Sequence, residues 1–484
     1  MFLWFGWPAV AETPPPAQPL TIAVSSAPKS LDPALATDAA GARILQLTNP
    51  ALLHYDASFT PTGLVAQGCT QKALTVTCTL RPGYRFHNGT PLTATALKDW
   101  FTFLQATPRS PLSALLEPVA AIAAPAADTL IFTLKQPTFG FLGRLVDIPL
   151  AAPPADKSLG APRPGLGTYR LAEQDAQGTV TVAPAPDSNL PALTFTPLAD
   201  PTTRLLKLKQ GEVDVVYQDI PPELFTWAQK QGWKTASAPS ASYTYLALNF
   251  TNPHLADARI RKGLSVAINR AAIRRHLLGG MAEPADSLLP PGHPALWPAP
   301  EDDYNPTRAE DLLNAAATLG DAQNSRFSLT LATSTDALSQ RVAQVLQQDL
   351  RRVGVDVILK PLEWGAFYDN VKAGRFDMAL MSWSGELPPD FLVQVFHSNK
   401  APPAGLNRGK VDIPVLDKAL DKLATATTVE AQTAAATQAQ QLAAGLLPYI
   451  PLYRRHHVLV ARPDVDGCAI PTSGGYQGLL GCRK

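Results

Sequence analysis

The chain carries almost no excess charge of either sign. Its 484 residues include 41 Lys and Arg against 40 Asp and Glu, which gives a formal net charge of +1 at pH 7. A protein whose main partner is nucleic acid needs a positive field, so this balance argues against that class. Beyond the first residues, no apolar run approaches the roughly 20 residues of a membrane-spanning helix. The length instead predicts two or more globular lobes.

Motifs of catalysis and of cofactor binding are also lacking. The sequence has no zinc-binding His-Glu-x-x-His, no phosphate-binding loop and no Ser-His-Asp arrangement. Residues 165–167, Gly-Leu-Gly, are too short for a dinucleotide fingerprint. His87 stands alone beside an expected turn, and the adjacent His456 and His457 would point to opposite faces of a strand. We therefore expect no enzyme, no cofactor and no metal site.

Cysteine is scarce, and the four residues fall into two local pairs. Cys69 and Cys78 flank a stretch that predicts a β-hairpin, so we expect a disulfide across the two strands. Cys468 and Cys482 would tie down the C-terminal tail in the same way. No Cys-x-x-Cys spacing occurs, which counts against a zinc or redox role. Two disulfides indicate an oxidising compartment; the alternative is four free thiols in a cytosolic protein.

The first 19 residues are typical of an export signal followed by a linker. An apolar stretch leads to Ala9-Val10-Ala11, a small-x-small pattern, and we expect cleavage after Ala11. Residues 12–19 are rich in proline and predict a linker. No cysteine lies near the cut, so a lipid anchor is not expected. The alternative is a disordered apolar tail.

What the chain does contain is an alternating α/β pattern, which is clearest at residues 355–390. Residues 355–360 alternate as a half-buried strand, residues 365–373 predict a helix that ends at Gly374, and residues 376–383 predict a buried strand. Ligands of open α/β sheets bind outside the carboxyl ends of the strands. This stretch places two tryptophans, Trp364 and Trp383, at such ends.

The same stretch resembles a known family, and further matches follow in order along the chain. The matching residues of the stretch are Gly354, Val355, Trp364, Gly374, Phe376, Asp377, Trp383, Glu386, Pro389, Asp390 and Phe391. Other matches are the Leu31-Asp32-Pro33 step, residues 80–100, Gly211 with Asp214, Asn249 and residues 448–453. Together they resemble the family 5 extracytoplasmic solute-binding proteins, which are the oligopeptide-, dipeptide- and nickel-binding components of ABC importers.

The resemblance implies an α/β fold with two lobes, the periplasmic-binding-protein fold of type II, cluster C. A small extra subdomain would be inserted in the first lobe. We expect lobe I at residues 20–50, 165–247 and 450–484, the inserted subdomain at 51–164, and lobe II at 248–449. The two lobes would close on a ligand by hinge motion.

The function implied by the resemblance is capture of a peptide and its delivery to an ABC permease. The protein would be a periplasmic monomer without a nucleic-acid partner. One alternative is a non-peptide solute, such as a nickel chelate, a sugar or an opine. A less favoured alternative is a secreted hydrolase that uses Glu386 with Asp390 or His397.

The resemblance also implies where the ligand would bind. Glu386 falls where peptide binders usually carry an Asp that pairs with the α-ammonium of the peptide, and the extra methylene moves the charge by about one bond length. Trp383 and Trp364 align with pocket-lining tryptophans; the alternatives are core packing for both and a surface acid for Glu386. The other expected ligand contacts are Ser384, Tyr217, Tyr245, Asn249, Lys372 and Tyr453.

Overall fold

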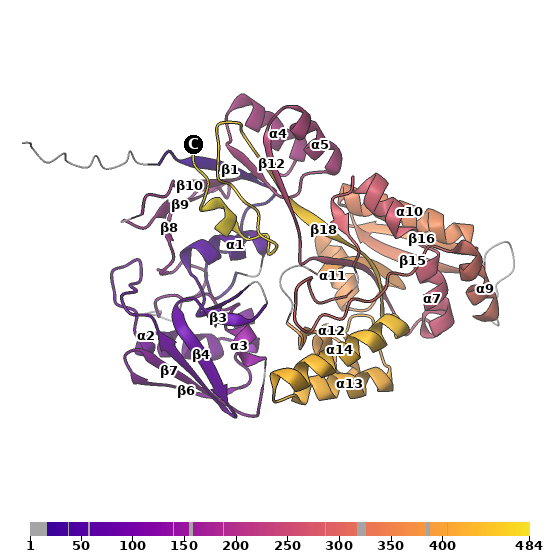
Figure 1. The fold of residues 1–484 in the computed structure, drawn as a ribbon, viewed down its shortest axis with the longest axis horizontal. Coiled ribbons are helices and arrows are strands. Elements are labelled where there is room, and N and C mark those ends of the chain that lie inside the picture. The colour runs from indigo at the N-terminus through magenta and orange to yellow at the C-terminus, as the bar shows by residue number, and fades with distance from the viewer. Residues whose placement is uncertain are drawn as a thin grey trace, which may run out of the picture.

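The computed structural model shows two lobes side by side, with a smaller third body below the first (Figure 1). It describes residues 17–36, 38–56, 59–138, 140–153, 158–186, 188–285, 287–316, 326–383, 388–403 and 405–484. The expected export signal lies outside these residues. In the described part, no helix is long and apolar enough to span a bilayer. The expected two-lobed α/β fold is confirmed.

Lobe I is built on β1 (Leu20–Val24), which pairs in parallel with two strands from later in the chain. The other strands of this lobe are β8 (Tyr169–Gln174), β9 (Val180–Pro184), β10 (Leu193–Pro197), β11 (Val215–Tyr217) and β12 (Lys234–Pro239). Its helices are α1 (Ala39–Thr48), α4 (Pro201–Gln210), α5 (Pro222–Lys230) and the short η4 (Tyr476–Leu479). Gly211 ends α4 at φ 78°, as a left-handed C-cap.

The inserted subdomain contains an antiparallel sheet in the order β4-β5-β7-β6, which one helix covers, and a separate two-stranded sheet of β2 and β3. Its strands are β2 (Leu53–Tyr55), β3 (Pro61–Gly63), β4 (Ala66–Lys72), β5 (Thr75–Leu80), β6 (Val119–Ala126) and β7 (Thr129–Leu134). Its helices are α2 (Ala94–Gln105), η1 (Pro111–Ala114) and α3 (Phe141–Arg144). Thr93 caps α2 by accepting a hydrogen bond from the amide of Ala96.

The sheet of lobe II has the strand order β16-β15-β17-β13-β18. The strands are β13 (Tyr243–Leu248), β14 (Ala282–Glu283), β15 (Phe327–Ser334), β16 (Val355–Leu362), β17 (Met378–Trp383) and β18 (Tyr449–Ala461). The helices are α6 (Pro253–Ala256), α7 (Ala258–Val266), α8 (Arg270–Ala272), η2 (Ile273–Leu277), α9 (Pro306–Ala316), α10 (Ala337–Arg352), α11 (Trp364–Lys372), α12 (Phe391–Phe396), η3 (Ser398–Lys400), α13 (Pro414–Thr425) and α14 (Val429–Leu446).

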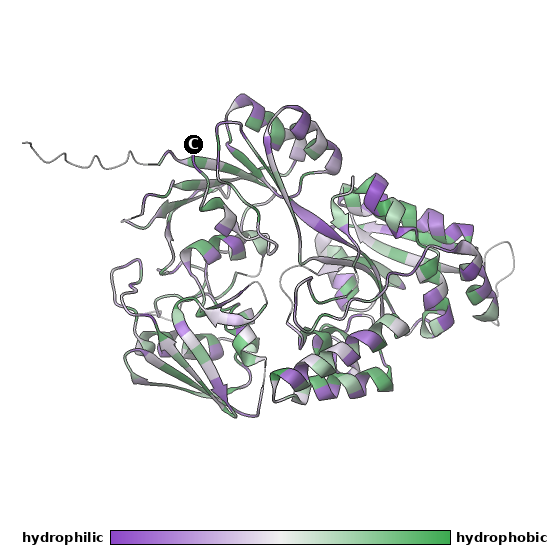
Figure 2. Cartoon of the chain, viewed as in Figure 1, coloured by the Kyte–Doolittle hydropathy of each residue, from purple (hydrophilic) through white to green (hydrophobic). Residues whose placement is uncertain are grey.

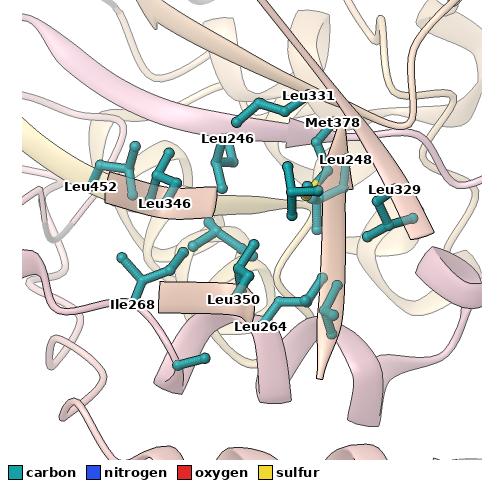
Figure 3. Close-up of a cluster of buried hydrophobic side chains, with 14 of the residues drawn as sticks. Leu246, Leu248, Leu264, Ile268, Leu329, Leu331, Leu346, Leu350, Met378 and Leu452 are labelled. Carbon is teal, nitrogen blue, oxygen red and sulfur yellow. The ribbon is translucent and has the colours of Figure 1, made fainter. Parts of the chain in front are cut away.

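Side chains that alternate along the lobe II strands pack into two separate hydrophobic cores. Leu246 and Met378 face the core shared with α7, α9 and α10 (Figure 3). Tyr245 and Ala379 face the opposite core, which α11, α12, α13 and α14 cover. This alternation follows from the two-residue period of a strand. The helices of lobe II carry hydrophilic as well as hydrophobic residues (Figure 2), as expected of helices that cover a core on one face and meet water on the other.

Two connections cross between the lobes. The first half of β18 pairs with β13 in lobe II, where Tyr453 lies opposite Thr244, and the second half pairs with β12 and β11 in lobe I. The link from β12 to β13 runs beside it. Arg454 is fully buried at the crossing and donates to the carbonyl oxygens of Ala241 and Ser242, both at 3.1 Å. Both crossings therefore lie in one place, as a hinge requires.

Both expected disulfides are present. Cys69 and Cys78 are directly opposite each other on β4 and β5 and are bonded. Cys468 is bonded to Cys482, which is fully buried in the core of lobe I. No free cysteine occurs in the described part of the chain.

Candidate functional site

One edge of the lobe II sheet faces the crossing to lobe I. Strands β15, β16 and β17 are parallel, so their carboxyl ends lie at the same edge. Trp383 ends β17 opposite Tyr243, the first residue of β13. Tyr453 of β18 pairs beside it and leads into lobe I. The expected site at the strand ends therefore lies on the side of lobe II that faces lobe I.

Trp383 is half-buried at this edge and is surrounded by aromatic and basic side chains. Its ring stacks on Tyr245, with centroids 6.1 Å apart, and meets Phe391 edge to face at 5.0 Å. The guanidinium carbon of Arg408 lies 4.6 Å from the centre of the indole. The indole N–H is enclosed, beside the buried hydroxyl of Tyr449. Trp383 thus combines core packing with a position at the strand end.

Trp364 begins α11 and is 54% exposed. Its ring stacks on Tyr368, with centroids 5.9 Å apart and planes 17° from parallel. Lys372, one turn further, places its ammonium 5.0 Å from the Tyr368 ring and pairs with Asp369 at 2.9 Å. An indole left half in solvent keeps a large apolar face free for a ligand.

Four of the expected ligand contacts lie in the protein interior. Tyr217, Tyr245 and Tyr453 are each at most 3% exposed, and burial raises the pKa of Tyr453 to about 12. Asn249 donates to the backbone oxygens of Phe376, at 2.8 Å, and Gly374, at 3.0 Å. These four residues pack and hold the backbone. Any part they have in binding would be through the shape of the site.

The end of β11 turns away from the sheet in an unusual conformation. Gln218 and Asp219 have φ angles of 61° and 50°, which non-glycine residues rarely adopt. Gln218 donates to the carbonyl oxygen of Gly474 at 2.7 Å, and the Asp219 carboxylate accepts from Ser25 at 2.6 Å. Asp219 is exposed, so this strand end presents a carboxylate while Tyr217 stays in the core.

Glu386 and Ser384 lie outside the described residues. Their neighbours along the chain are described: Trp383 ends β17, and Asp390 precedes α12. The proposed pairing of Glu386 with a ligand amine stays a prediction.

His87 and Asp32, the acid of the Leu31-Asp32-Pro33 step, have structural contacts. The ring Nε2 of His87 lies 3.0 Å from the carbonyl oxygen of Gly167, and burial lowers the pKa of this histidine. The Asp32 carboxylate accepts from the amide of Ala34 at 2.9 Å, as a turn initiator does. Among the described residues, no group of three His, Cys, Asp or Glu is placed to hold a metal ion.

Two contacts near Trp383 were not predicted from the sequence. Arg408, in the loop before α13, reaches the indole face, and Asp390 contacts Arg144 of the inserted subdomain with 4.0 Å between Oδ2 and Nη2. The sequence gives no signal for either contact, because each joins segments that are separated by loops or lie far apart in the sequence.

A partly open space of about 60 Å³ lies in lobe II, between residues 287–302 and α14. Gln440 crosses it and donates to the carbonyl oxygen of Ala295 at 2.7 Å. Its lining is more apolar than polar, and a space of this size has room for a few water molecules. Tyr243, the first residue of β13, also lines this space.

Known proteins are similar to this chain over most of its length. Residues 60–402 match the model of the bacterial extracellular solute-binding proteins, family 5. The chain is 26% identical over 490 residues to the glutathione-binding protein GsiB of Salmonella typhimurium, covering 95% of this chain and 94% of that protein. This relative is a binding protein.

Solved structures share the fold along nearly the whole chain. NikA from Brucella suis in complex with Fe(III)-EDTA has a TM-score of 0.85 at 24% identity, covering 96% of this chain and 99% of that one. The oligopeptide-binding protein AppA from Bacillus subtilis in complex with a nonapeptide has a TM-score of 0.80 at 20% identity, covering 97% and 99%.

Proposed function

Because the chain belongs to the bacterial extracellular solute-binding proteins of family 5, we propose that it captures peptides between its two lobes for an ABC importer. The observation that carries this proposal is the position of Trp383 and Trp364 at the strand-end edge of lobe II that faces lobe I. The likeness to a glutathione-binding protein over nearly the whole chain supports a peptide ligand, since glutathione is a tripeptide.

The proposed mechanism is closure of the lobes around the ligand. Peptide backbone can be held by strand-like hydrogen bonds. The indole faces of Trp383 and Trp364 would cover apolar side chains or a cation, and Glu386 would pair with the α-ammonium. The liganded form would dock on a membrane permease. Two disulfides fit a protein that works in the periplasm, and we expect a monomer there.

No turnover is part of this proposal. The two residues considered as partners of Glu386 in a hydrolase have other contacts. Asp390 faces Arg144, and His397 places Nε2 3.0 Å from the carboxylate of Asp421. A hydrolytic site would need such groups free to reach a substrate.

The test is to identify the ligand that the protein binds. Native mass spectrometry of the protein purified from the periplasm would detect bound solutes, and calorimetry would then measure affinities for di- to pentapeptides and for nickel chelates. Binding of peptides without turnover supports the proposal. Binding of chelates, sugars or opines with silence toward every peptide would overturn the peptide assignment, and peptide cleavage during the titration would favour an enzyme.

A further inference from the structure

Five arginines among the described residues are buried, and four of them are held in the same way. Each of the four donates at least three hydrogen bonds, mostly to backbone carbonyl oxygens. They are Arg204, Arg261, Arg270 and Arg454. This is the usual solution, because a guanidinium has five N–H donors and losing water without gaining acceptors is costly.

The fifth, Arg408, is different. It is 6% exposed, yet its side chain makes one hydrogen bond, from Nη2 to the hydroxyl of Tyr368 at 3.2 Å. It makes no ion pair within the described part of the chain. None of its nitrogens is an enclosed atom without a partner, so the nitrogens that make no hydrogen bond touch open space. A charged group in this state is unsatisfied by the protein but can be reached by a small polar group.

Two aromatic rings hold this cation in place. Its guanidinium carbon lies 5.1 Å from the centre of Tyr368 and 4.6 Å from the centre of Trp383. Such stacking stabilises an arginine and fixes the plane of its N–H fork without using its donors. Lys372 adds a second positive charge at the Tyr368 ring. The arrangement keeps a planar donor fork oriented beside Trp383, the last residue of β17.

The geometry points to an anion-binding subsite at Arg408, between Tyr368 and Trp383, that takes a carboxylate of the captured ligand. A carboxylate can accept two parallel N–H bonds from one guanidinium, which supplies what Arg408 lacks. The inference deepens the proposed function and rests on it for the position of the ligand. Peptides offer two sources of this group, the C-terminus and an acidic side chain.

A purely structural role for Arg408 makes a different prediction. If the guanidinium only joins α11 to β17 through its two rings, replacing it would lower the melting temperature and weaken acidic and neutral ligands equally. If it binds a carboxylate, replacing it would remove the preference for acids over matched amides. That preference is a ratio of two affinities measured on one protein, so a general loss of stability does not change it.

The experiment uses matched acid and amide probes on the full mature chain. Calorimetry would compare Ala-Glu-Ala with Ala-Gln-Ala, Ala-Ala-Ala with its C-terminal amide, and, outside peptides, glutarate with glutaramide. The proteins would be the wild type, Arg408→Gln, Arg408→Lys and the control Arg375→Gln, which changes an exposed arginine beyond the end of α11. Circular dichroism would establish that each variant is folded.

We expect the wild type and Arg375→Gln to bind at least one acid about tenfold or more tightly than its amide. Arg408→Gln should bind the two forms equally, and Arg408→Lys should keep part of the preference. The pair that discriminates identifies the C-terminus or a side chain as the source. Peptide binding without discrimination, or discrimination that survives in Arg408→Gln, would overturn the subsite and leave the peptide function intact. Discrimination for glutarate alone, with no peptide bound, would support the subsite and overturn the peptide function. No binding of any probe would overturn both.

Discussion

Arg144 of the inserted subdomain and Asp390 of lobe II face each other across the two lobes, with 4.0 Å between Nη2 and Oδ2. Glycine permits this approach, since a Cβ on Gly140 would come within 3.3 Å of the Asp390 carboxyl carbon. A second contact lies nearby, where the rings of Phe59 and His293 are 5.6 Å apart. The inserted subdomain therefore contacts lobe II directly, in addition to the hinge strands.

Asp390 should make the stability of the protein depend on pH. Its Oδ1 is enclosed without a hydrogen-bond partner among the described residues, and burial raises the pKa of this carboxyl above its ordinary 3.8, although Arg144 partly opposes the shift. A raised pKa contributes stability that is complete at pH below 3.8 and is lost as the pH rises through the raised value. Asp390→Asn should therefore have a higher melting temperature than the wild type near pH 7.

The measurement is a series of thermal melts of both proteins from pH 3.5 to 7.5. The advantage of Asp390→Asn should shrink toward the acidic end, where the wild-type carboxyl becomes mostly protonated in both the folded and the unfolded state. A variant whose stability deficit relative to the wild type grows as the pH rises from 3.5 to 7.5 would show that the ion pair with Arg144 outweighs the cost of burial.

Trp364 should matter for binding and little for stability. Because the side chain is 54% exposed, Trp364→Ala should change the free energy of unfolding by no more than about 0.5 kcal/mol, as at other surface positions. If the indole covers ligand, affinity should fall by about 1–3 kcal/mol. The control is Val415→Ala, an exposed apolar residue on α13. Equal affinities for the wild type and Trp364→Ala would remove Trp364 from the site.

Local pattern was enough to predict the elements that carry the site. The alternation at residues 355–360 predicted β16, and the left-handed stop at Gly374, with φ 68°, ends α11 as expected. The hairpin at Cys69 and Cys78 followed from the same kind of local reasoning. These predictions succeed because strand period, helix caps and tight turns depend on neighbouring residues.

The faces of the strands were harder to predict. Tyr245 and Tyr217 lie on strands near the lobe junction, and the sequence pattern does not say whether such a face meets ligand or helices. In the structure, α11 to α14 cover the Tyr245 face, and Tyr476 from the C-terminal tail covers Tyr217, with ring centres 5.2 Å apart. The contact of Arg408 with Trp383 depends on a loop conformation that composition does not specify.

The Cys468–Cys482 disulfide should stabilise lobe I by fixing the tail that covers its core. It closes a loop of 14 residues, and within it Tyr476 stacks on Phe195 with ring centres 4.5 Å apart. Loop-closure entropy for this length corresponds to about 3 kcal/mol. We expect the double variant Cys468→Ser, Cys482→Ser to lose about this much in denaturant unfolding, and unchanged stability would show that packing alone holds the tail.

Glu386 should determine whether a free amine on the ligand is required. The family resemblance implies that it takes the position of an acid that pairs with a peptide α-ammonium. Glu386→Ala should then weaken binding of an amine-bearing peptide by about 2–5 kcal/mol, the range for breaking a buried charge pair. An N-acetylated peptide has no ammonium, so the wild type and Glu386→Ala should bind it with similar, weak affinity.

The variant Glu386→Asp tests whether binding depends on the position of the negative charge as well as on its presence. It keeps the negative charge but withdraws it by about one bond length, so an intermediate loss would show that this chain holds its ligand amine at a distance set by glutamate. Calorimetry with the same free and acetylated peptide on all three proteins gives each comparison in one experiment. Equal affinities of the wild type and Glu386→Ala for the free peptide would exclude Glu386 from the site, and the ammonium would then need another partner, for which the exposed carboxylate of Asp219 in lobe I is the first to test.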